Sequence, residues 1–403
     1  YLRAAADRLD WLRVDWVRAV EQTDWRNLRQ RLYATKRNYF RLGIALDARL
    51  EQAFLETEIN ANAMLYGGNA HPTAIVNEGN FRRYARLRHG IGAIDFHDDT
   101  PVWLFSTAGL FMGTDGVLHA IREQGRNAGR RTVERLDPDL LFSLIDDGSA
   151  YLASQVQADG RFHYGWHPCF DRPIGAYNSL RHASSTYAML ESWEVTRSPE
   201  LLTAIERALA CLEQELICPA TLPDGTHAAF LVDPGNEAKL GGNAVCLLAL
   251  VKYSELMATD RYRPLLDQLA AGMLHMQDRT SGRFVHVLDF PTLVVKQDFR
   301  IIYYDGEAAF GLMRLYGLTG DPRWIEAVAR AFTHFIAAGH AAAHDHWLSY
   351  CVNELTRYRS DEAWFRFGLD NVRDHLDFVE NRITTFPTLL ELMMAAQHMI
   401  ARL

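Results

Sequence analysis

Residues 312–324 read LMRLYGLTGDPRW, an apolar helical segment followed by a tight polar turn and the start of another helix. Two earlier segments have the same order, 187–199 (YAMLESWEVTRSP) and 250–262 (LVKYSELMATDRY). The turn threonines at positions 196, 259 and 319 are therefore 63 and 60 residues apart. A near-constant period of this kind indicates a repeated helical hairpin.

A second set of turns falls between these, at Gly160, Gly225 and Gly282, which are 65 and 57 residues apart. A period of about sixty residues fits two helices of roughly twenty residues, one short turn and one long loop. This arrangement predicts a toroid of helical hairpins with all long loops at one end. An open solenoid is the alternative, but its units have about 34–47 residues and short connections on both sides. The long loops 159–181 and 282–303 favour the toroid.

Further helices are expected in the last quarter of the chain, around 347–358, 361–379 and 386–403, giving about five hairpins in all. We therefore predict a mainly α fold, an (α/α)6 toroid over residues 138–403, with a boundary near Leu136-Asp137-Pro138.

The N-terminal part, residues 1–137, has a different texture. Leu9, Leu12, Trp16 and Val20 recur at helical spacing, and no Gly or Pro interrupts before position 43. This pattern predicts an N-terminal helical extension over about 65 residues, which would supply a sixth hairpin and close the ring. Turn-rich segments and a short strand over 100–105 are expected to follow. Because the chain begins without Met or an apolar signal core, we expect a module of a longer chain or complex, and its compartment is not indicated.

Composition limits the class of protein. The 403 residues include 42 Lys and Arg and 50 Asp and Glu, a formal charge of −8, with 48% hydrophobic residues and 11% aromatics. This is the composition of a soluble globular protein. The acidic balance argues against a nucleic-acid partner, and no run approaches the ~18 apolar residues of a membrane span. No nucleotide-binding or serine-hydrolase motif is present, so we expect no cofactor.

Metal and disulfide sites are not expected either. The five cysteines include no CxxC pair and are predicted to be free thiols, compatible with the cytoplasm. His163 and His167 are four residues apart but flank Gly165, and His344-x-His346 alone is a weak metal signal. A metal site is therefore the less favoured interpretation of these histidines.

Unusual polar and aromatic residues gather in the long loops and the helix starts that follow them, which a toroid brings to one mouth. The residues predicted to bind substrate there are Tyr164, Trp166, His163, Arg181, Lys239, Asn243, Arg300, His346 and Trp347. Arg181 suits two-point contact with a carboxylate or sugar hydroxyls, although a structural role tying loop carbonyls is equally common. The aromatic rings suit flat sugar faces, with core packing as the alternative.

Carboxylates also gather at this end. Glu307 begins a helix before Ala308-Ala309 and is predicted to point inward, where burial would raise its pKa and fit it for general acid catalysis. Asp305 or Asp298 is the predicted partner, although Asp305 would also serve as an ordinary helix cap. His182 and Tyr304 are the candidate bases if the reaction is an elimination or epimerisation.

Residues 303–308 and 315–324 resemble repeats of the six-hairpin (α/α)6 carbohydrate-active enzymes, which include glycosidases, polysaccharide lyases and the helical domain of glucuronyl C5-epimerases. Residues 177–182 (YNSLRH) are similar to the Tyr-Asp-Leu-Arg-His segment of the epimerases, with one extra residue. The two segments occur in the reverse of the epimerase order. The resemblance therefore implies an architecture over 138–403 and action on carbohydrate, and transfers no catalytic role.

These observations predict an enzyme that acts on a glycan, with hydrolysis by paired carboxylates as the leading reaction. A lyase or C5-epimerase acting on uronic-acid polysaccharides is one alternative, since Arg181, Lys239 and Arg300 would suit an acidic substrate. A non-catalytic module that binds a polysaccharide or a protein is the other.

Overall fold

The computed structural model describes residues 11–114, 116–125, 127–167, 171–382 and 386–403. The chain divides into two compact units. The first comprises residues 1–136 and 165–174, and the second comprises 137–164 and 175–403. Each unit has its own hydrophobic core.

The first unit is built on an antiparallel sheet in the order β1-β4-β2-β3, with β5 also paired to β4. Its strands are β1 (Leu12–Asp24), β2 (Gly43–Ala45), β3 (Ala53–Phe54), β4 (Pro101–Met112) and β5 (Leu118–Ile121). Its helices are α2 (Trp25–Tyr33), α3 (Glu56–Ala61) and α4 (Glu78–His89). Trp25, Phe54 and Phe81 are fully buried and pack edge to face.

The predicted N-terminal helical extension is wrong where the structure describes it. Leu12–Asp24 is a strand paired along its whole length with β4, from Leu12 opposite Met112 to Asp24 opposite Pro101. Between residues 11 and 65, only Trp25–Tyr33 and Glu56–Ala61 are helical. Long-range pairing with β4 decides the conformation of a segment whose spacing also fits a helix. The expected strand at 100–105 is present as part of β4.

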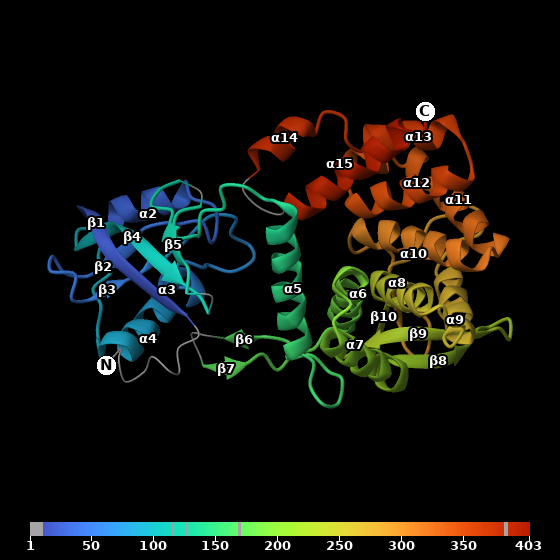
Figure 1. Cartoon of the computed structure of the whole chain (residues 1–403), viewed down its shortest axis with the longest axis horizontal. Helices are drawn as coiled ribbons and strands as arrows, with labels where there is room; N and C mark the ends of the chain where they lie inside the picture. The colour runs from blue at the N-terminus through green and yellow to red at the C-terminus, as the bar shows by residue number, and fades with distance from the viewer. Residues whose placement is uncertain (1–10, 115, 126, 168–170, 383–385) are drawn as a thin grey trace. The chain divides into compact units, whose positions relative to one another are not determined.

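The second unit is a ring of helical hairpins, as predicted (Figure 1). Five helices pack side by side in sequence along the inside: α6 (Ser179–Thr196), α8 (Leu240–Met257), α10 (Tyr303–Thr319), α12 (His346–Tyr358) and α15 (Phe386–Ile400). The outer helices are α5 (Pro138–Ser154), α7 (Pro199–Cys211), α9 (Arg263–His275), α11 (Pro322–Ala337) and α13 (Glu362–Asp370). Helix α6 packs on α5 and α7, α8 on α9, α10 on α11, and α12 and α15 on α13. A short helix, α14 (Leu376–Asn381), precedes α15.

The described residues of the second unit supply five inner helices and five outer helices. The sixth hairpin expected from the N-terminal residues is not formed by them, because their described part folds into the separate β-sheet unit. The toroid and the five hairpins counted from the repeats are confirmed, and the predicted source of the sixth is wrong.

The repeat glycines have a common structural reason. Gly160 and Gly282 have φ of +83° and +78°, and an ideal Cβ would lie 2.2 Å from the carbonyl oxygen of Arg207 and 2.1 Å from that of Arg330. Any side chain at these two positions would collide with the backbone of the outer helix α7 or α11. Gly225 has a positive φ of +86° but open space around it. The turns at Gly160 and Gly282 therefore require glycine for packing as well as conformation.

A small antiparallel sheet occupies the long loops before α8 and α10. Its order is β12-β11-β10-β9-β8, from strands β8 (Ile217–Thr221), β9 (His227–Asp233), β10 (Glu237–Lys239), β11 (Val287–Asp289) and β12 (Val295–Gln297). This sheet holds the starts of two inner helices, since Leu240 donates its N–H to the carbonyl of His286 at 2.9 Å.

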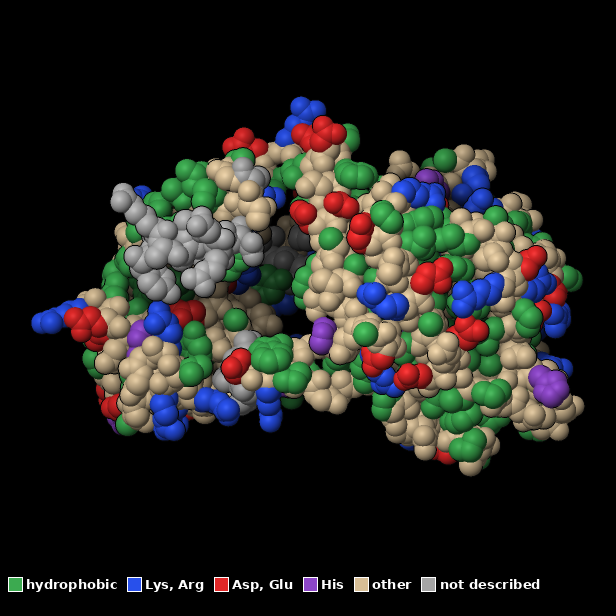
Figure 2. All heavy atoms as spheres, turned by 60° about the horizontal axis from the view of Figure 1, so that its bottom comes forward, with side chains coloured by type: hydrophobic (Ala, Val, Ile, Leu, Met, Phe, Trp, Pro, Cys, Tyr) green, Lys and Arg blue, Asp and Glu red, His purple; other side chains and the backbone are tan. Residues whose placement is uncertain are grey.

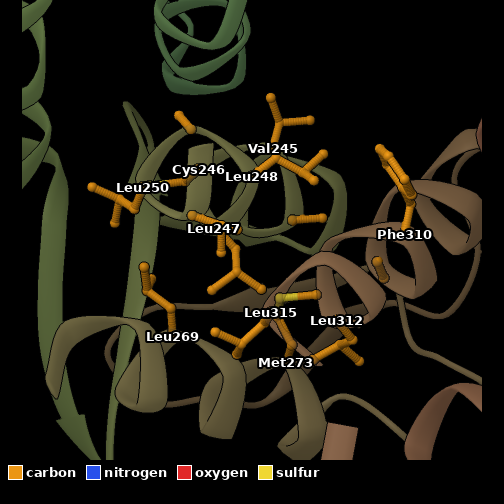
Figure 3. Packing of buried hydrophobic residues seen from close by; sticks show 14 of the residues in the cluster. Val245, Cys246, Leu247, Leu248, Leu250, Leu269, Met273, Phe310, Leu312 and Leu315 are labelled. Atoms are coloured by element: carbon orange, nitrogen blue, oxygen red, sulfur yellow. The ribbon is translucent and has the colours of Figure 1, made fainter. Parts of the chain in front are cut away.

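Helix α8 is the centre of the packing. Every residue from Leu240 to Ser254 is buried, and Leu247, Met273 and Leu315 from α8, α9 and α10 meet in one cluster (Figure 3). Among the described residues, α8 is the one helix long and apolar enough to cross a membrane, and 83% of that window is buried inside the protein. Burial on all sides is what a core helix requires. On the face drawn in Figure 2, acidic and basic side chains are interspersed with apolar ones.

Candidate active site

The first turns of successive inner helices lie against one another at glycines. An ideal Cβ on Gly241 of α8 would lie 2.1 Å from Glu307 Oε2 and 2.4 Å from a ring carbon of Tyr304, both on α10. An ideal Cβ on Gly306 of α10 would lie 2.4 Å from Asp345 Oδ2, at the start of α12. The missing side chains allow carboxyl groups from neighbouring helices to converge at one end of the ring.

Glu307 is the most perturbed carboxyl at this end. Its side chain is 6% exposed, and Oε2 has no hydrogen-bond partner among the described residues. Its pKa is raised to about 8, mainly by burial and also by the nearby charge of Asp345, while Arg181 acts in the opposite direction. The predicted inward orientation of Glu307 is thus observed. A carboxyl in this state holds its proton at neutral pH and can donate it.

Asp345 is the second carboxyl, and it was not among the predicted catalytic residues. It is fully buried before α12 and accepts hydrogen bonds from the N–H groups of Leu348 at 2.9 Å and Trp347 at 3.3 Å. Its pKa is raised to about 7, mainly by burial; the two N–H groups oppose this shift and the charge of Asp305 adds to it. The Asn371 side chain holds the Asp345 backbone from both sides.

Glu307 and Asp345 therefore have unequal environments. Both are buried, and each disfavours ionisation of the other because like charges repel in a water-poor site. Asp345 has two N–H donors at a helix N-terminus for its charged form, whereas Oε2 of Glu307 has none. The negative charge of the pair accordingly falls on Asp345 and the proton stays on Glu307. Two coupled carboxyls titrate as a pair, and between its lower and upper titration steps the pair holds one proton.

The predicted partners of Glu307 occupy other positions. Asp298 is exposed in the loop after β12, and its carbonyl accepts a hydrogen bond from the His286 N–H. Asp305 is 3% exposed in the first turn of α10, where Oδ2 lies 3.3 Å from His286 Nε2. The carboxyl that acts on Glu307 is Asp345, which corrects the expectation for Asp298. A signal for Asp345 was available, because it begins an inner helix as Asp305 and Glu307 do.

Arg181 is placed to face both the pair and a cavity. It is exposed at the start of α6, and its charge acts on Glu307. The cavity, of about 380 Å³, lies between α5 and α6 and is lined by Arg181, Tyr164, His163, Gln155, Asn178 and Ser185, among others. No Asp or Glu lines it. The structure thus brings together three of the predicted substrate-binding residues.

His182 also borders this cavity, but both of its ring nitrogens are engaged. Nε2 lies 2.9 Å from the carbonyl oxygen of Ala208, and Nδ1 lies 2.7 Å from the hydroxyl of Tyr177. Because a carbonyl only accepts, Nε2 carries the proton and Nδ1 accepts from Tyr177. Burial lowers the pKa of His182 to about 4. The ring is therefore a neutral structural bridge, which corrects the expectation that it serves as a base.

Lys239 and Arg300 are held in ion pairs at the edge of the small sheet. Lys239 bonds to Asp233 and lies 3.3 Å from Glu237, and Arg300 lies 3.1 Å from Glu237. Arg300, Lys296 and Lys239 together lower the pKa of Glu237 to about 2. Their charges are compensated within the protein and hold the sheet.

Tyr304 and Asn243 lie deeper than predicted. Tyr304 is 9% exposed, and burial raises the pKa of its hydroxyl although Lys239 and Arg300 oppose the shift. Asn243 is fully buried and bonds to the N–H and carbonyl of Leu231 and to the carbonyl of Lys239. These hydrogen bonds join β9 to α8 and occupy the Asn243 amide, which corrects its predicted contact with substrate.

Aromatic rings line the inner side next to Asp345. Trp347 is half-buried, with ring centroids 6.1 Å from Phe310 and 6.2 Å from Tyr350. His346 lies beside it at 5.2 Å, and burial lowers the pKa of His346 to about 4. Trp166, by contrast, is in β6 (Trp166–His167) of the first unit.

Metal and disulfide chemistry find no site in the described part of the chain. No group of three or more His, Cys, Asp or Glu side chains there could hold a metal ion. Cys211, Cys218, Cys246 and Cys351 are free thiols, as predicted, and Cys169 lies outside the described residues.

Comparisons with known proteins give structural neighbours only. No family model matches the sequence, and no curated protein matches it. D-mannose isomerase is similar in structure at 10% identity and a TM-score of 0.46, covering 60% of this chain and 71% of that chain. The alpha-1,6-mannanase GH76A of Salegentibacter sp. HEL1_6 matches at 10% identity and 0.45, covering 64% and 99%. Cellobiose 2-epimerase from Bacillus thermoamylovorans B4167 matches at 7% identity and 0.49, covering 65% and 87%.

Proposed function

We propose that the second unit is a carbohydrate-active enzyme that cleaves a glycan by hydrolysis, with Glu307 as general acid and Asp345 as its ionised partner. The observation that carries this proposal is the buried carboxyl pair, in which two backbone N–H groups stabilise the charge of one member and the other has no donor. Glycoside hydrolysis needs one protonated and one ionised carboxyl at the scissile bond.

The surroundings of the pair support a sugar substrate. Trp347 lies two residues after Asp345 and presents a half-buried ring, which suits the apolar face of a sugar. Arg181, whose charge acts on Glu307 from α6, is suited to bind hydroxyl or acidic groups of the same glycan. Within the reaction, Glu307 would give its proton to the leaving oxygen while Asp345 activates water or attacks the anomeric carbon.

Elimination or epimerisation is less favoured, since it needs a base that can reach a carbon-bound proton. His182 has both nitrogens engaged, and burial raises the pKa of the Tyr304 hydroxyl. A non-catalytic glycan-binding role does not account for two buried carboxyls with raised pKa values, a feature that clusters at catalytic sites.

The test is a screen of the whole chain against neutral and acidic polysaccharides, with reducing ends and ultraviolet absorbance of unsaturated products measured together. New reducing ends without absorbance select hydrolysis. On the substrate found, Glu307→Gln and Asp345→Asn are each expected to lower kcat by about 10²–10⁴-fold. Asp298→Asn, an exposed carboxyl in the loop before α10, is the matched control and should retain activity. Full activity of Glu307→Gln, or unsaturated products in place of new reducing ends, contradicts the proposal.

A further inference from the structure

His286 is a buried histidine whose ring is fixed on several sides. It lies immediately before β11 and is fully buried. Its Nδ1 accepts hydrogen bonds from the backbone N–H groups of Arg300 at 2.9 Å and Ile301 at 3.4 Å. Its ring centroid lies 4.7 Å from that of Phe299 and 5.4 Å from that of Tyr304. Because Nδ1 is an acceptor, the neutral ring carries its proton on Nε2.

The Nε2–H group of His286 faces one carboxylate. Asp305 Oδ2 lies 3.3 Å away, and both side chains are almost completely buried, at 1% and 4% exposed. Nε2 makes no well-formed hydrogen bond to any atom among the described residues. A buried N–H group is costly without an acceptor, so Asp305 is the group that this ring is placed to hold.

Asp305 connects His286 to the proposed carboxyl pair. Residues 305–307 lie near the start of α10, where Asp305 faces His286, Gly306 lies against Asp345 and Glu307 lies against Gly241. The charge of Asp305 raises the pKa of Asp345, and Asp345 in turn raises that of Glu307. The three carboxyls therefore form one electrostatically connected row.

We infer that His286 is a positioning residue of the proposed active site: its Nε2–H faces the Asp305 carboxylate and fixes that charge at the start of α10, next to Asp345 and Glu307. The inference rests on the proposed function for the role of the pair, but the proton arrangement itself can be measured without any substrate.

The other ionisable groups near this row do not cancel the charge of Asp305. His340 faces Asp305 and His286, and burial lowers its pKa. His346 lies 3.5 Å from Asp345 Oδ1, and burial lowers its pKa to about 4. Both rings are neutral at neutral pH. Among the described residues, Arg181 is the permanent cation whose charge acts on Glu307.

The experiment is an infrared titration of the whole chain, following the carbonyl stretch of protonated carboxyl groups. Asp305→Asn removes a like charge beside Asp345. The lower titration step of the Asp345–Glu307 pair, which is the lower of its two pKa values, is therefore expected to move down by roughly half a pH unit or more. His286→Phe removes the donor that holds Asp305 and is expected to move the same step in the same direction. The double variant should match Asp305→Asn alone, because both changes act through one carboxylate.

His286→Asn, which keeps an N–H donor, is the conservative variant and is expected to move the step less than Asp305→Asn does. Asp298→Asn, an exposed carboxyl outside the row, controls for loss of any carboxyl. An unchanged titration in Asp305→Asn, or additive shifts in the double variant, overturns the inference. If His286→Phe does not fold, a shift in His286→Asn as large as that in Asp305→Asn overturns the role of the donor.

This outcome is separable from that of the proposed function. If no polysaccharide is cleaved but the titration shifts as described, the hydrolase proposal fails and the positioning role of His286 stands. If cleavage depends on Glu307 but the titration of Asp305→Asn is unchanged, the inference about His286 fails alone.

Discussion

Replacing Glu307 with Gln should make the protein more stable relative to wild type as the pH rises. Burial raises the folded-state pKa of Glu307 to about 8 from an ordinary value of 4.5. Between these two values the folded protein keeps a proton that the unfolded chain has released. The free energy of unfolding of the wild type therefore falls as the pH rises through this window. Gln carries no such proton, so the loss is absent in the variant.

The size of the effect follows from the shift. At about 1.4 kcal/mol per pKa unit, the difference between 4.5 and about 8 corresponds to at most ~5 kcal/mol. Part of this shift comes from Asp345, which itself changes charge over the same range. We therefore expect Glu307→Gln to gain ~2–4 kcal/mol over wild type between about pH 5 and about pH 8.

The assay is urea unfolding of both proteins at about pH 5 and about pH 8, followed by far-ultraviolet circular dichroism, which reports mainly on the helical unit. The informative quantity is how the difference in the free energy of unfolding between Glu307→Gln and wild type changes with pH, because any packing cost of Gln is the same at both pH values. Asp298→Asn, an exposed carboxyl, should show no such change. A difference between Glu307→Gln and wild type that is equal at the two pH values would refute the proposed burial of a protonated carboxyl.

Three other changes test the framework around the site. Gly241→Ala would place a methyl group 2.1 Å from Glu307 Oε2, so kcat should fall about 10²-fold while the circular dichroism spectrum is retained. Asn243→Ala leaves the backbone N–H and carbonyl of Leu231 without their partner and should cost about 1–3 kcal/mol in urea unfolding. Gly282→Ala collides with the carbonyl of Arg330 and forces an unfavourable φ, so its melting temperature should fall more than that of Gly225→Ala, which has open space.

The toroid could be predicted from sequence because its signals are local. The α6–α7 and α10–α11 turns each combine a left-handed residue and a capping residue: Arg197 with φ of 55° is followed by the cap Ser198, and Gly320 by the cap Asp321. The repeat then multiplies one local signal several times. The β-sheet of the first unit could not be predicted in this way, since β1 pairs with a strand about 90 residues later and its own spacing fits a helix.

The candidate site was predictable only in part, for a related reason. The inward orientation of Glu307 follows from the small residues beside it, but its partner depends on which helix start lies nearest in space. Asp345 had the form of an ordinary N-cap in the sequence, and it does cap α12. Its second role comes from burial and from the close approach at Gly306, neither of which is visible in the local sequence.

The caps explain why acid and base can differ within one carboxyl pair. Inner helices in a ring of hairpins all run in the same direction, so their N-termini, with unpaired N–H groups, meet at one end. A carboxyl at the cap position, such as Asp345, receives those N–H groups and bears charge easily. A carboxyl just after the first turn, such as Glu307, points across to the neighbouring helix at Gly241, and its Oε2 receives none from the described residues. The two chemical states that hydrolysis requires thus follow from helix position, with the buried His286–Asp305 contact fixing the balance between them.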